Sequence, residues 1–480
     1  MKEYKLFIDG QWTDSGDARL RDDLNPATGE VFARVHQASP ADVDRAITAA
    51  HRAAKSWAES LPGQREVILM KAAVLLEERQ QEYVDILIDE AGATFGKAMA
   101  ETSFVVNLLR SAAGEARRIF GETMPSDSPG VFSMSVRRPL GVIAGIAPFN
   151  FPFLLAAKKV VRAIAAGNSF VLKPASDTAV IGLKIAELLH DAGLPAGVVN
   201  VVPGSGGSVG DLLVDDPRIA MVTFTGSTEV GKKLAVRAAS RLKKITLELG
   251  GKSPMIVLED ADLQYAVDAA AFGVFLNQGQ VCMANSRIFV QSGIYQAFCD
   301  LFAAKVKGLQ VGDPRDPHTV IGPLINPAQC DFLNGQVQDA LAKGARLLTG
   351  GDWEGAFYQP TILADVTTAM QVFYEESFGP LVSIIEVADH EQALMQANDT
   401  CYGLSSAVIT NDLQKAMQLA LGLEAGMVHI NGSSAYDEPH VPFGGVKDSG
   451  MGREGGHYSM EEMTEVKWIT LQMGQRQFPF

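Results

Sequence analysis

The stretch "GVIAGIAPFNFPFLLAAKKVVRAIAAGNSFVLKP", residues 141–174, decides the fold class because its residue pattern changes twice. A short apolar run at 141–148 gives way to apolar residues at helical spacing, and this segment ends at Gly167. A second apolar run follows at 169–174. Short apolar strands on either side of a helix are typical of a parallel sheet covered on both faces. The stretch therefore predicts a strand, a helix and a strand of a doubly wound α/β sheet.

The same alternation continues towards the C-terminus. It predicts helices at 178–193 and 227–239, and strands at 198–204, 219–226 and 244–251. A second α/β unit is expected to begin near Lys252 and to run to about Asn431. Ligands of such sheets bind where strands end and helices begin.

The two ends of the chain have different patterns. The first 35 residues indicate short strands and turns, and helices then run from Ser39, a suitable cap before Pro40, to about Gly121. The final segment "EVKWITLQ", 465–472, alternates like a strand. Because little chain remains to pair with it, we expect it to join a sheet edge elsewhere, with a second subunit as one option.

Composition narrows the class of protein. The chain has 480 residues, enough for two or three folding units, and its net charge of −15 disfavours nucleic acid or an anionic membrane as partner. The uncharged run at 139–157 is broken by three prolines, which argues against a membrane span. The chain has four cysteines, and their spacings suit neither a zinc site nor a disulfide framework. It also lacks a secretory signal, and both observations favour the cytoplasm. No metal is expected. The cysteines are Cys282, Cys299, Cys330 and Cys401.

Cys282 follows the polar, glycine-containing turn "NQGQ" at the end of an apolar segment. A free thiol has a pKa of about 8.5 and becomes a strong nucleophile when its surroundings supply a base or lower that pKa. The other interpretation is a structural cysteine, which we retain for the remaining three. The glycine turn favours exposure of the Cys282 thiol.

Three further segments carry polar groups at strand ends, each with two interpretations. The segment "FTGSTEVG" is either a phosphate site at a helix start or an ordinary turn. Glu248, in the otherwise apolar "LELGGKSP", is either hydrogen-bonded locally or a general base. Asn150, in "APFNFPF", is either a turn former or an oxyanion donor.

Taken in order, these segments resemble the NAD(P)-dependent aldehyde dehydrogenase superfamily. The resemblance covers "PFNFP", "VLKPAS", "FTGSTEVG", "LELGGKSP", "NQGQVC", "EESFGP" and "PFGGVKDSGMGREGG", with "FIDGQW" and "NPATGE" near the N-terminus. It implies a Rossmann-like NAD(P)-binding domain (1–121 and 139–251), an α/β catalytic domain (252–431), a return to the cofactor domain (432–466) and a small β oligomerisation arm (122–138 and 467–480). A homodimer or homotetramer is implied.

The resemblance also implies a reaction and roles. An aldehyde is oxidised to its acid through a cysteine thiohemiacetal and a thioester, with water as acyl acceptor. Cys282 is the implied nucleophile, Asn150 and the Cys282 N–H hold the oxyanion, Glu248 is the base, and Glu465 falls where some members have a second proton-relay acid. The implied cofactor-binding residues are Pro148, Lys173, Ser176, Gly226, Ser227, Gly231, Leu249, Glu376 and Phe378. The implied substrate pocket is Phe151, Leu155, Lys158, Val281, Met283, Tyr436 and Asp437.

Two positions depart from the family pattern. Ser176 replaces a glutamate common in NAD-preferring members, so we expect NADP to be accepted beside NAD. Lys158 stands where several members have tryptophan; it either attracts an anionic tail or points to solvent. The remaining apolar and aromatic positions suit a benzaldehyde-like or medium aliphatic aldehyde.

Three alternatives stay open. The "PFNFP…AAKK" and "VKDSGMGREGG" segments also resemble dehydrogenases of small polar aldehydes such as lactaldehyde or a semialdehyde. A CoA-acylating dehydrogenase would pass the acyl group to CoA, although the presence of Glu248 argues against it. A non-catalytic structural member of the fold would not need both Cys282 and Glu248.

Overall fold

The stretch 141–174 forms the centre of an eight-stranded sheet in the computed structural model, which describes residues 2–480. Strand β8 (Val142–Ile146), helix α5 (Pro152–Ala165) and strand β9 (Ser169–Lys173) follow one another as predicted. Side chains of β8 alternate between two cores: Val142 and Ala144 pack in one cluster and Ile143 in the other. The strand is therefore buried on both faces, and the α/β fold is confirmed.

The eight-stranded sheet has the order β22-β12-β11-β8-β9-β10-β2-β3. Its five central strands are parallel, and β2, β3 and β22 pair antiparallel at the two edges. The other strands are β2 (Leu6–Ile8), β3 (Gln11–Thr13), β10 (Val199–Val201), β11 (Ile219–Thr225), β12 (Lys244–Glu248) and β22 (Gly450–Met451). The helices of this lobe are α1 (Pro40–Ala58), α2 (Pro62–Glu78), α3 (Gln80–Ala91), α4 (Phe95–Glu115), α6 (Ala179–Asp191), α7 (Asp211–Asp215), α8 (Thr228–Ala239) and α15 (Gly456–Glu462).

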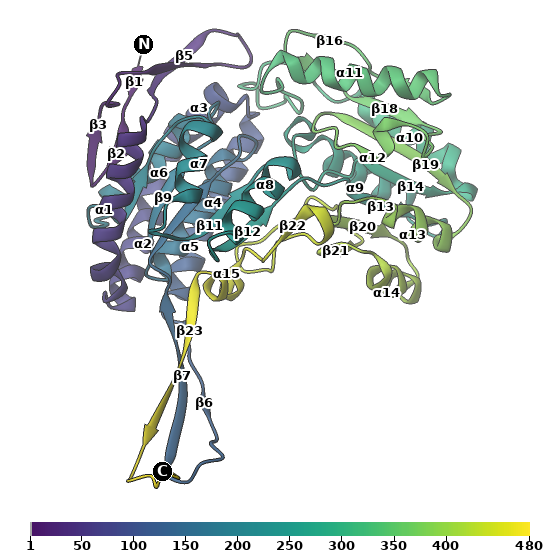
Figure 1. Cartoon of the computed structure of the whole chain (residues 1–480). Coiled ribbons are helices and arrows are strands. Elements are labelled where there is room, and N and C mark those ends of the chain that lie inside the picture. Colours follow the sequence, from purple (N-terminus) through teal and green to yellow (C-terminus); the bar gives the residue numbers. More distant parts are fainter. Residues whose placement is uncertain (1) are drawn as a thin grey trace.

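A second sheet of seven strands forms the other lobe, on the right of Figure 1. Its order is β15-β18-β19-β14-β13-β20-β21, and only β15 is antiparallel to its neighbour. The strands are β13 (Pro254–Val257), β14 (Arg287–Gln291), β15 (Arg346–Thr349), β18 (Thr361–Ala364), β19 (Leu381–Val387), β20 (Ser405–Ile409) and β21 (Met427–Ile430). The helices are α9 (Leu263–Phe275), α10 (Tyr295–Lys307), α11 (Pro327–Ala342), α12 (Gln371–Tyr374), α13 (His390–Asn398) and α14 (Leu413–Gly422), and a short hairpin pairs β16 (Trp353–Glu354) with β17 (Phe357–Tyr358).

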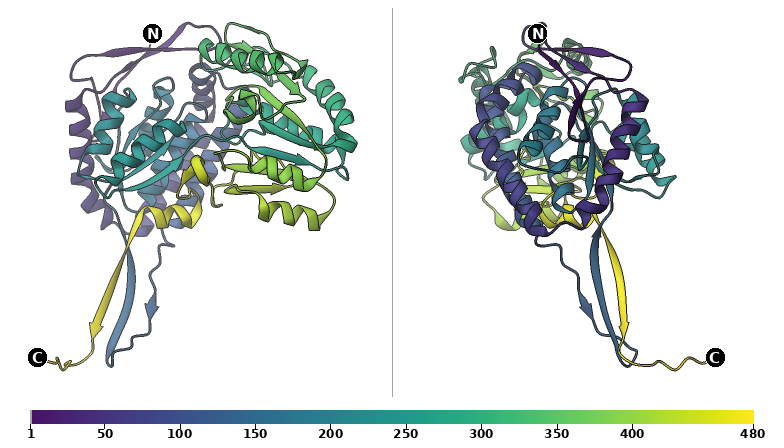
Figure 2. Two further views of the ribbon diagram at one scale, coloured as in Figure 1. Left: turned by 45° about the vertical axis from the view of Figure 1, so that its right-hand side comes forward. Right: turned by 90° about the vertical axis from the view of Figure 1, so that its left-hand side faces the viewer.

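A narrow three-stranded arm extends away from both lobes (Figures 1 and 2). It consists of β6 (Thr123–Met124), β7 (Val131–Pro139) and β23 (Thr464–Gln472). The final strand β23 pairs antiparallel with β7 of its own chain along its whole length, from Thr464 opposite Pro139 to Gln472 opposite Val131. Pairing with β7 occupies one edge of β23, and its other edge has no strand beside it among residues 2–480, so contact with a second subunit stays a prediction.

The N-terminal segment forms a small sheet of β1 (Lys2–Tyr4), β5 (Val31–His36) and β4 (Leu20–Leu24). Helix α1 begins as predicted, because the Ser39 hydroxyl accepts a hydrogen bond from the Asp42 N–H and the Asp42 carboxylate binds back to the Ser39 N–H. The uncharged run at 139–157 becomes β8 and the start of α5 inside the core. Among residues 2–480, no helix combines the length and the apolar character needed to cross a membrane.

Candidate active site

The order of strands creates a switch point between β8 and β11. From β8 the chain moves to β9 and β10 on one side, and then returns to place β11 on the other side. Ligands of open α/β sheets bind beyond the carboxyl ends of the strands at such a point. A cavity of about 430 Å³ lies there. Of the residues singled out in the sequence, it is lined by Pro148, Asn150, Lys173, Gly226, Ser227, Leu249, Cys282, Glu376 and Phe378.

The turn from β11 into α8 has the shape of a cradle for a phosphate group. Ser227 is the N-cap of α8, but its side chain makes no capping hydrogen bond, so the first N–H groups of the helix are not satisfied by it. A Cβ atom on Gly226 would lie 2.5 Å from the Phe224 ring, and one on Gly231 would lie 2.4 Å from the Leu249 side chain. A side chain at either glycine would displace Phe224 or Leu249, both of which line the cavity.

Lys173 lies at the end of β9 on the same cavity. Burial, followed by the positive charge of Arg21, lowers the pKa of Lys173 to about 8. Ser176 does not line the cavity itself; its hydroxyl donates to the Gly204 carbonyl at 3.4 Å, and its neighbour Asp177 pairs with Arg21. Gly231 likewise lies behind the wall rather than on it. Among the sequence-predicted cofactor residues, these two act through their neighbours.

Glu376 and Phe378 form the opposite wall. Glu376 accepts a hydrogen bond from the Gly251 N–H at 3.1 Å, and burial raises its pKa to about 7. Phe378 has a positive φ of 51° and packs edge-to-face on Phe149 at 5.7 Å between ring centroids. A carboxylate that accepts a single hydrogen bond has further acceptor positions free, and these suit ribose hydroxyl groups.

The turn before Cys282 is strained and tightly anchored. Asn277, Gln278 and Gly279 all have positive φ values, of 50°, 56° and 72°. The Gln278 amide donates to the carbonyls of Gly92 and Pro323, at 3.1 and 3.0 Å, and Gln280 accepts from the Ile325 N–H at 3.0 Å. The polar residues of "NQGQ" are thus buried anchors, and the strain is held at the site by surrounding hydrogen bonds.

Cys282 is partly exposed at the end of the cavity, whereas Cys299 and Cys330 are buried in the core. Burial raises the pKa of the Cys282 thiol to about 12, and the negative charges of Glu376 and Glu248 add to this effect. The resting thiol is therefore protonated, so nucleophilic attack requires a base that takes its proton.

Asn150 is fixed next to the nucleophile. Its side-chain amide donates to the Gln280 carbonyl at 3.0 Å, two residues before Cys282. Its own carbonyl accepts from Asn277 at 3.0 Å and from Lys97 at 2.9 Å, and Lys97 pairs with Glu101 at 2.5 Å. Lys97 and Glu101 carried no signal in the sequence, because they lie in α4, far from every motif.

Glu248 ends β12 as a buried carboxyl, and neither of its oxygens has a hydrogen-bond partner among the described residues. Burial and the negative charge of Glu454 raise the pKa of Glu248 well above its usual range. Burial also opposes charge on Glu454, but Lys159 at 2.6 Å and the charge of Lys158 hold the Glu454 pKa below its usual range. The surroundings therefore favour the charged form of Glu454 more than that of Glu248.

Glu465 does not belong to this group. It lies in β23 opposite Arg138, its side chain is 63% exposed, and it pairs with Lys244 at 3.2 Å. Its partner Lys244 begins β12 whereas Glu248 ends it, so the structure does not bring Glu465 to the base, and the proton-relay role has no support in this arrangement. The second acid beside Glu248 is Glu454, and the signal for it was the glutamate enclosed by glycines in "GMGREGG".

The predicted substrate positions divide into three kinds. Leu155 and Val281 are buried, Phe151 and Met283 are partly exposed, and Tyr436 is 53% exposed with its hydroxyl on Glu438. Lys158 is only 1% exposed and pairs with Asp437, so the expectation that it points to solvent is wrong. The charges of Lys158 and Asp437 both affect the pKa of Cys282, which places the pair close to the thiol.

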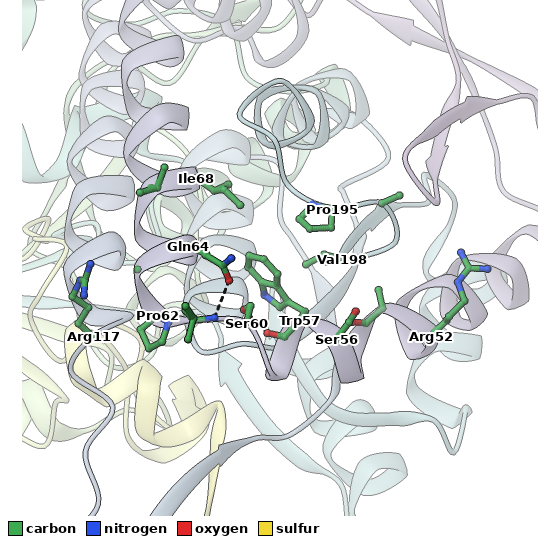
Figure 3. A pocket seen from close by; sticks show the side chains of 15 residues that line it. Arg52, Ser56, Trp57, Ser60, Pro62, Gln64, Ile68, Arg117, Pro195 and Val198 are labelled. Carbon is green, nitrogen blue, oxygen red and sulfur yellow. Dashed lines mark hydrogen bonds between the residues drawn. The ribbon is translucent and has the colours of Figure 1, made fainter.

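A larger hollow, of about 1160 Å³, lies between α1, the start of α2 and residues 195–198 (Figure 3). Trp57, Pro195 and Val198 face it, and Gln64 accepts a hydrogen bond from the Leu61 N–H at its edge. Its lining includes no cysteine, histidine or carboxylate among the described residues. The chemistry therefore belongs to the smaller cavity.

Comparison with known proteins agrees with this geometry. The family model described as "Aldehyde dehydrogenase family" matches residues 12–469. The chain is 42% identical to a vanillin dehydrogenase of Pseudomonas fluorescens over the whole of both chains. It is 39% identical to a glutarate-semialdehyde dehydrogenase of Pseudomonas putida, covering 97% of each. The crystal structure of a salicylaldehyde dehydrogenase from Pseudomonas putida G7, complexed with salicylaldehyde, superposes with a TM-score of 0.98 at 38% identity and full coverage of both chains.

The chain is thus an oxidoreductase that converts an aldehyde to its acid with a nicotinamide cofactor. The match along nearly its whole length shows that it belongs to the aldehyde dehydrogenase family.

Proposed function

We propose that the substrate is a benzaldehyde-like aromatic aldehyde and that Cys282, Asn150 and Glu248 carry out its oxidation. The observation that supports this proposal most is that Cys282 and Asn150 line one cavity together with Leu249 and Gly250, the two residues that follow Glu248. The partly exposed thiol, the amide of Asn150 and the unpartnered carboxyl of Glu248 come from three separate elements. The vanillin and salicylaldehyde dehydrogenases among the relatives support an aromatic substrate. A medium aliphatic aldehyde remains the second choice.

The first half of the reaction forms a covalent bond to Cys282. The thiol loses its proton to a base as sulfur attacks the carbonyl carbon, and the carbonyl oxygen becomes an alkoxide. The Asn150 amide turns from the Gln280 carbonyl to this alkoxide, joined by the Cys282 N–H. A nicotinamide cofactor held along the cavity by residues such as Lys173 and Glu376 would supply the acceptor for the hydride that leaves the same carbon. Cys282 then carries a thioester.

The second half releases the acid. Glu248 takes a proton from water, whose oxygen attacks the thioester carbon, and the carbon–sulfur bond breaks to return the Cys282 thiolate, which regains a proton. The raised pKa of Glu248 suits this role, because a base whose pKa lies nearer to neutrality takes a proton more effectively. Burial is the main cause of the raised pKa of Glu248; the charge of Glu454 adds to it and that of Lys159 opposes it.

We further propose that NADP is accepted beside NAD. Ser176, next to Ala175 on the cavity wall, carries no charge that would repel a 2′-phosphate, and Lys173 and Arg21 place two cations nearby. Ser176→Glu should lower kcat/KM with NADP by about tenfold or more, the effect of roughly 1.4 kcal/mol of repulsion, while NAD is little affected. A wild-type preference for NAD above roughly 10³ would contradict this proposal.

The alternatives make different predictions. A CoA-acylating enzyme would yield no acid without CoA, and the unpartnered Glu248 carboxyl argues against it. A semialdehyde or lactaldehyde dehydrogenase would prefer short polar substrates, as the glutarate-semialdehyde dehydrogenase among the relatives suggests. A structural member of the fold would bind cofactor and turn over no aldehyde.

For the assembly, we propose a homodimer or homotetramer joined through the arm. Trp468 is 70% exposed, Leu471 55% and Phe132 45%, an apolar surface that contact with another copy would bury. The four cysteines are all free, which supports a reducing compartment such as the cytoplasm.

The decisive experiment follows the appearance of reduced cofactor with purified protein, NAD or NADP, and a panel of aromatic, aliphatic and carboxylated aldehydes. Cys282→Ser should abolish turnover, and Cys401→Ser, which changes an exposed thiol, should leave it intact. Acid formed without CoA would exclude the acylating alternative. Lack of turnover with every aldehyde would favour the structural alternative.

A further inference from the structure

Two consecutive lysines of α5 hold two different carboxylates. Lys159 pairs with Glu454, beside the base Glu248, and Lys158 pairs with Asp437. Both ammonium groups are buried, with exposed fractions of 0% and 1%. The Lys159 pair has a role in the mechanism above, whereas the Lys158–Asp437 pair has none. A buried ion pair costs desolvation energy, so its presence calls for a reason.

The Lys158 ammonium is enclosed on its other sides by aromatic rings. Its nitrogen lies 4.2 Å from the centre of the Phe443 ring and 5.7 Å from that of Phe104. The positive charge is thus satisfied by one carboxylate and one or two ring faces. Together these four residues form a cluster whose surface is mostly apolar and whose net charge is close to zero.

This cluster is connected by hydrogen bonds to the loop that carries Cys282, the nucleophile loop. Ser434, three residues before Asp437, donates its hydroxyl to the carbonyl of Met283, the residue after Cys282. The Ser434 N–H donates to the Asn285 side chain at 3.1 Å. Because these bonds fix the segment that carries Asp437 against the loop that carries the thiol, the ion pair lies close to the nucleophile loop.

Asp437 has unused capacity to accept hydrogen bonds. One carboxylate oxygen binds Lys158, and the other, Oδ1, is buried without any hydrogen-bond partner among residues 2–480. An ionised carboxylate offers about four acceptor positions. The Asp437 side chain keeps 11% of its surface exposed, and the carboxylate torsion of aspartate is broad, so a small rotation presents an oxygen to a ligand.

We propose that the Lys158–Asp437 pair selects neutral, hydroxyl-bearing aromatic aldehydes: the free Asp437 oxygen accepts a hydrogen bond from the ring hydroxyl. The proposal rests on the function proposed above and narrows its substrate class. Aldehydes with a carboxylate tail are disfavoured, because Asp437 already neutralises Lys158 and repels a second anion. Lys158 therefore does not recruit an anionic tail.

The test measures kcat/KM for the three hydroxybenzaldehydes, benzaldehyde and a carboxybenzaldehyde in the wild type and in Asp437→Asn. The wild type should prefer its best hydroxybenzaldehyde to the carboxybenzaldehyde by about tenfold or more. Asp437→Asn leaves the Lys158 charge unpaired, so the ratio of hydroxy to carboxy substrate should fall by about 10- to 100-fold, the range expected for one hydrogen bond to a charged group. The ratio isolates substrate choice from any general loss of activity.

A second variant keeps the proposal testable if Asp437→Asn folds poorly. The double change Lys158→Met with Asp437→Leu replaces the ion pair by apolar groups, which proteins often tolerate. It should lose the preference for hydroxyl over unsubstituted benzaldehyde without gaining activity on the carboxylated substrate. Asp268→Asn, in an exposed pair with Lys305, is the matched control and should keep wild-type ratios.

The outcomes separate the two proposals. Cys282-dependent turnover of benzaldehydes with ratios that do not change in Asp437→Asn or in the double variant overturns this inference and leaves the proposed function standing. A wild type that prefers the carboxybenzaldehyde also overturns it. A wild type that oxidises only aliphatic aldehydes, or none, overturns the proposed aromatic function together with the inference.

Discussion

At the scale of single residues, the proposed chemistry depends on polar atoms that are positioned from distant parts of the chain. Asn150 is held by Gln280, 130 residues later, and Glu248 lies beside Glu454. The Asn150 amide bonds a neighbouring carbonyl, and both Glu248 oxygens lack a partner in the described part of the chain. Groups of this kind are available to a reacting substrate, and substitutions at these positions should affect rate more than folding.

Asn150→Ala should lower kcat by roughly 10²–10³, the usual effect of losing one oxyanion donor, because the Cys282 N–H remains. Steady-state kinetics with the best aromatic aldehyde would measure the loss. Asn411→Ala, at an exposed position, is the matched control and should match the wild type. Activity within a factor of about three of wild type would rule out a role for Asn150 in oxyanion binding.

Glu248→Gln should separate the two halves of the reaction. If Glu248 serves only deacylation, reduced cofactor should appear in a rapid burst near one equivalent per site, followed by slow turnover. The raised pKa of Glu248 means that the wild-type carboxyl gains its basic form only as pH rises above the usual range for glutamate, so the deacylation rate should rise with pH. That rise should be absent in the variant. Loss of the burst itself would instead show that Glu248 also takes the thiol proton.

At the scale of elements, the turn between α9 and Cys282 is the most constrained segment of the site. A Cβ atom on Gly279 would lie 2.1 Å from the Gly379 carbonyl oxygen, in a residue whose φ is already positive. Gly279→Ala should therefore displace the thiol and reduce activity by more than tenfold while cofactor binding is kept. Titration of cofactor fluorescence together with kinetics would measure both. Gly335→Ala, where a Cβ meets nothing within 4 Å, should be neutral.

A second element-scale feature joins β4, α3 and α6 through two buried carboxyls. Glu90 accepts from the N–H groups of Val180 and Ile181, at 2.5 and 2.9 Å, and the negative charge of Asp23 acts on it. Burial raises the pKa of Asp23 to about 6 and that of Glu90 well above its usual range. Because the folded-state pKa values exceed the unfolded ones, bound protons stabilise the fold.

The stabilising contribution of this pair is complete below about pH 4 and is lost as pH rises through about 6. Asp23→Asn removes one of the two acids, so its melting temperature relative to wild type should rise between these pH values. Thermal unfolding across this pH range would measure the difference. A difference that is independent of pH would show that the two carboxyls do not share a proton in the folded protein.

At the scale of the whole molecule, the arm is the part that the single chain does not explain. Figure 2 shows it projecting from the lobes with little of its surface covered. Trp468→Glu combined with Leu471→Glu should shift the protein towards smaller species in light scattering, because charge would then replace the exposed apolar surface. Met395→Glu, at an exposed position in α13, should not change the assembly. An unchanged mass for the arm variant would place the interface elsewhere.

The sequence alone determined the fold class and singled out nine of the residues that line the cavity. Residues 141–174 alternate in pattern because β8 and β9 are buried on both faces of the sheet and α5 covers one of these faces. Local composition therefore predicts the architecture. The cofactor residues follow strand ends for the same reason. Cys282, Asn150 and Glu248 could be singled out because a polar residue within an apolar segment needs an explanation.

The tertiary structure decided what depends on contacts between distant segments. It placed Glu465 on the arm and Glu454 beside the base, although both are glutamates near the C-terminus. It paired Lys158 with Asp437, 279 residues away, where the sequence could offer only a choice between solvent and an anionic ligand. The local residue pattern reflects how each segment by itself is buried. The partners of charged side chains are set by packing between segments, so the local pattern does not predict them.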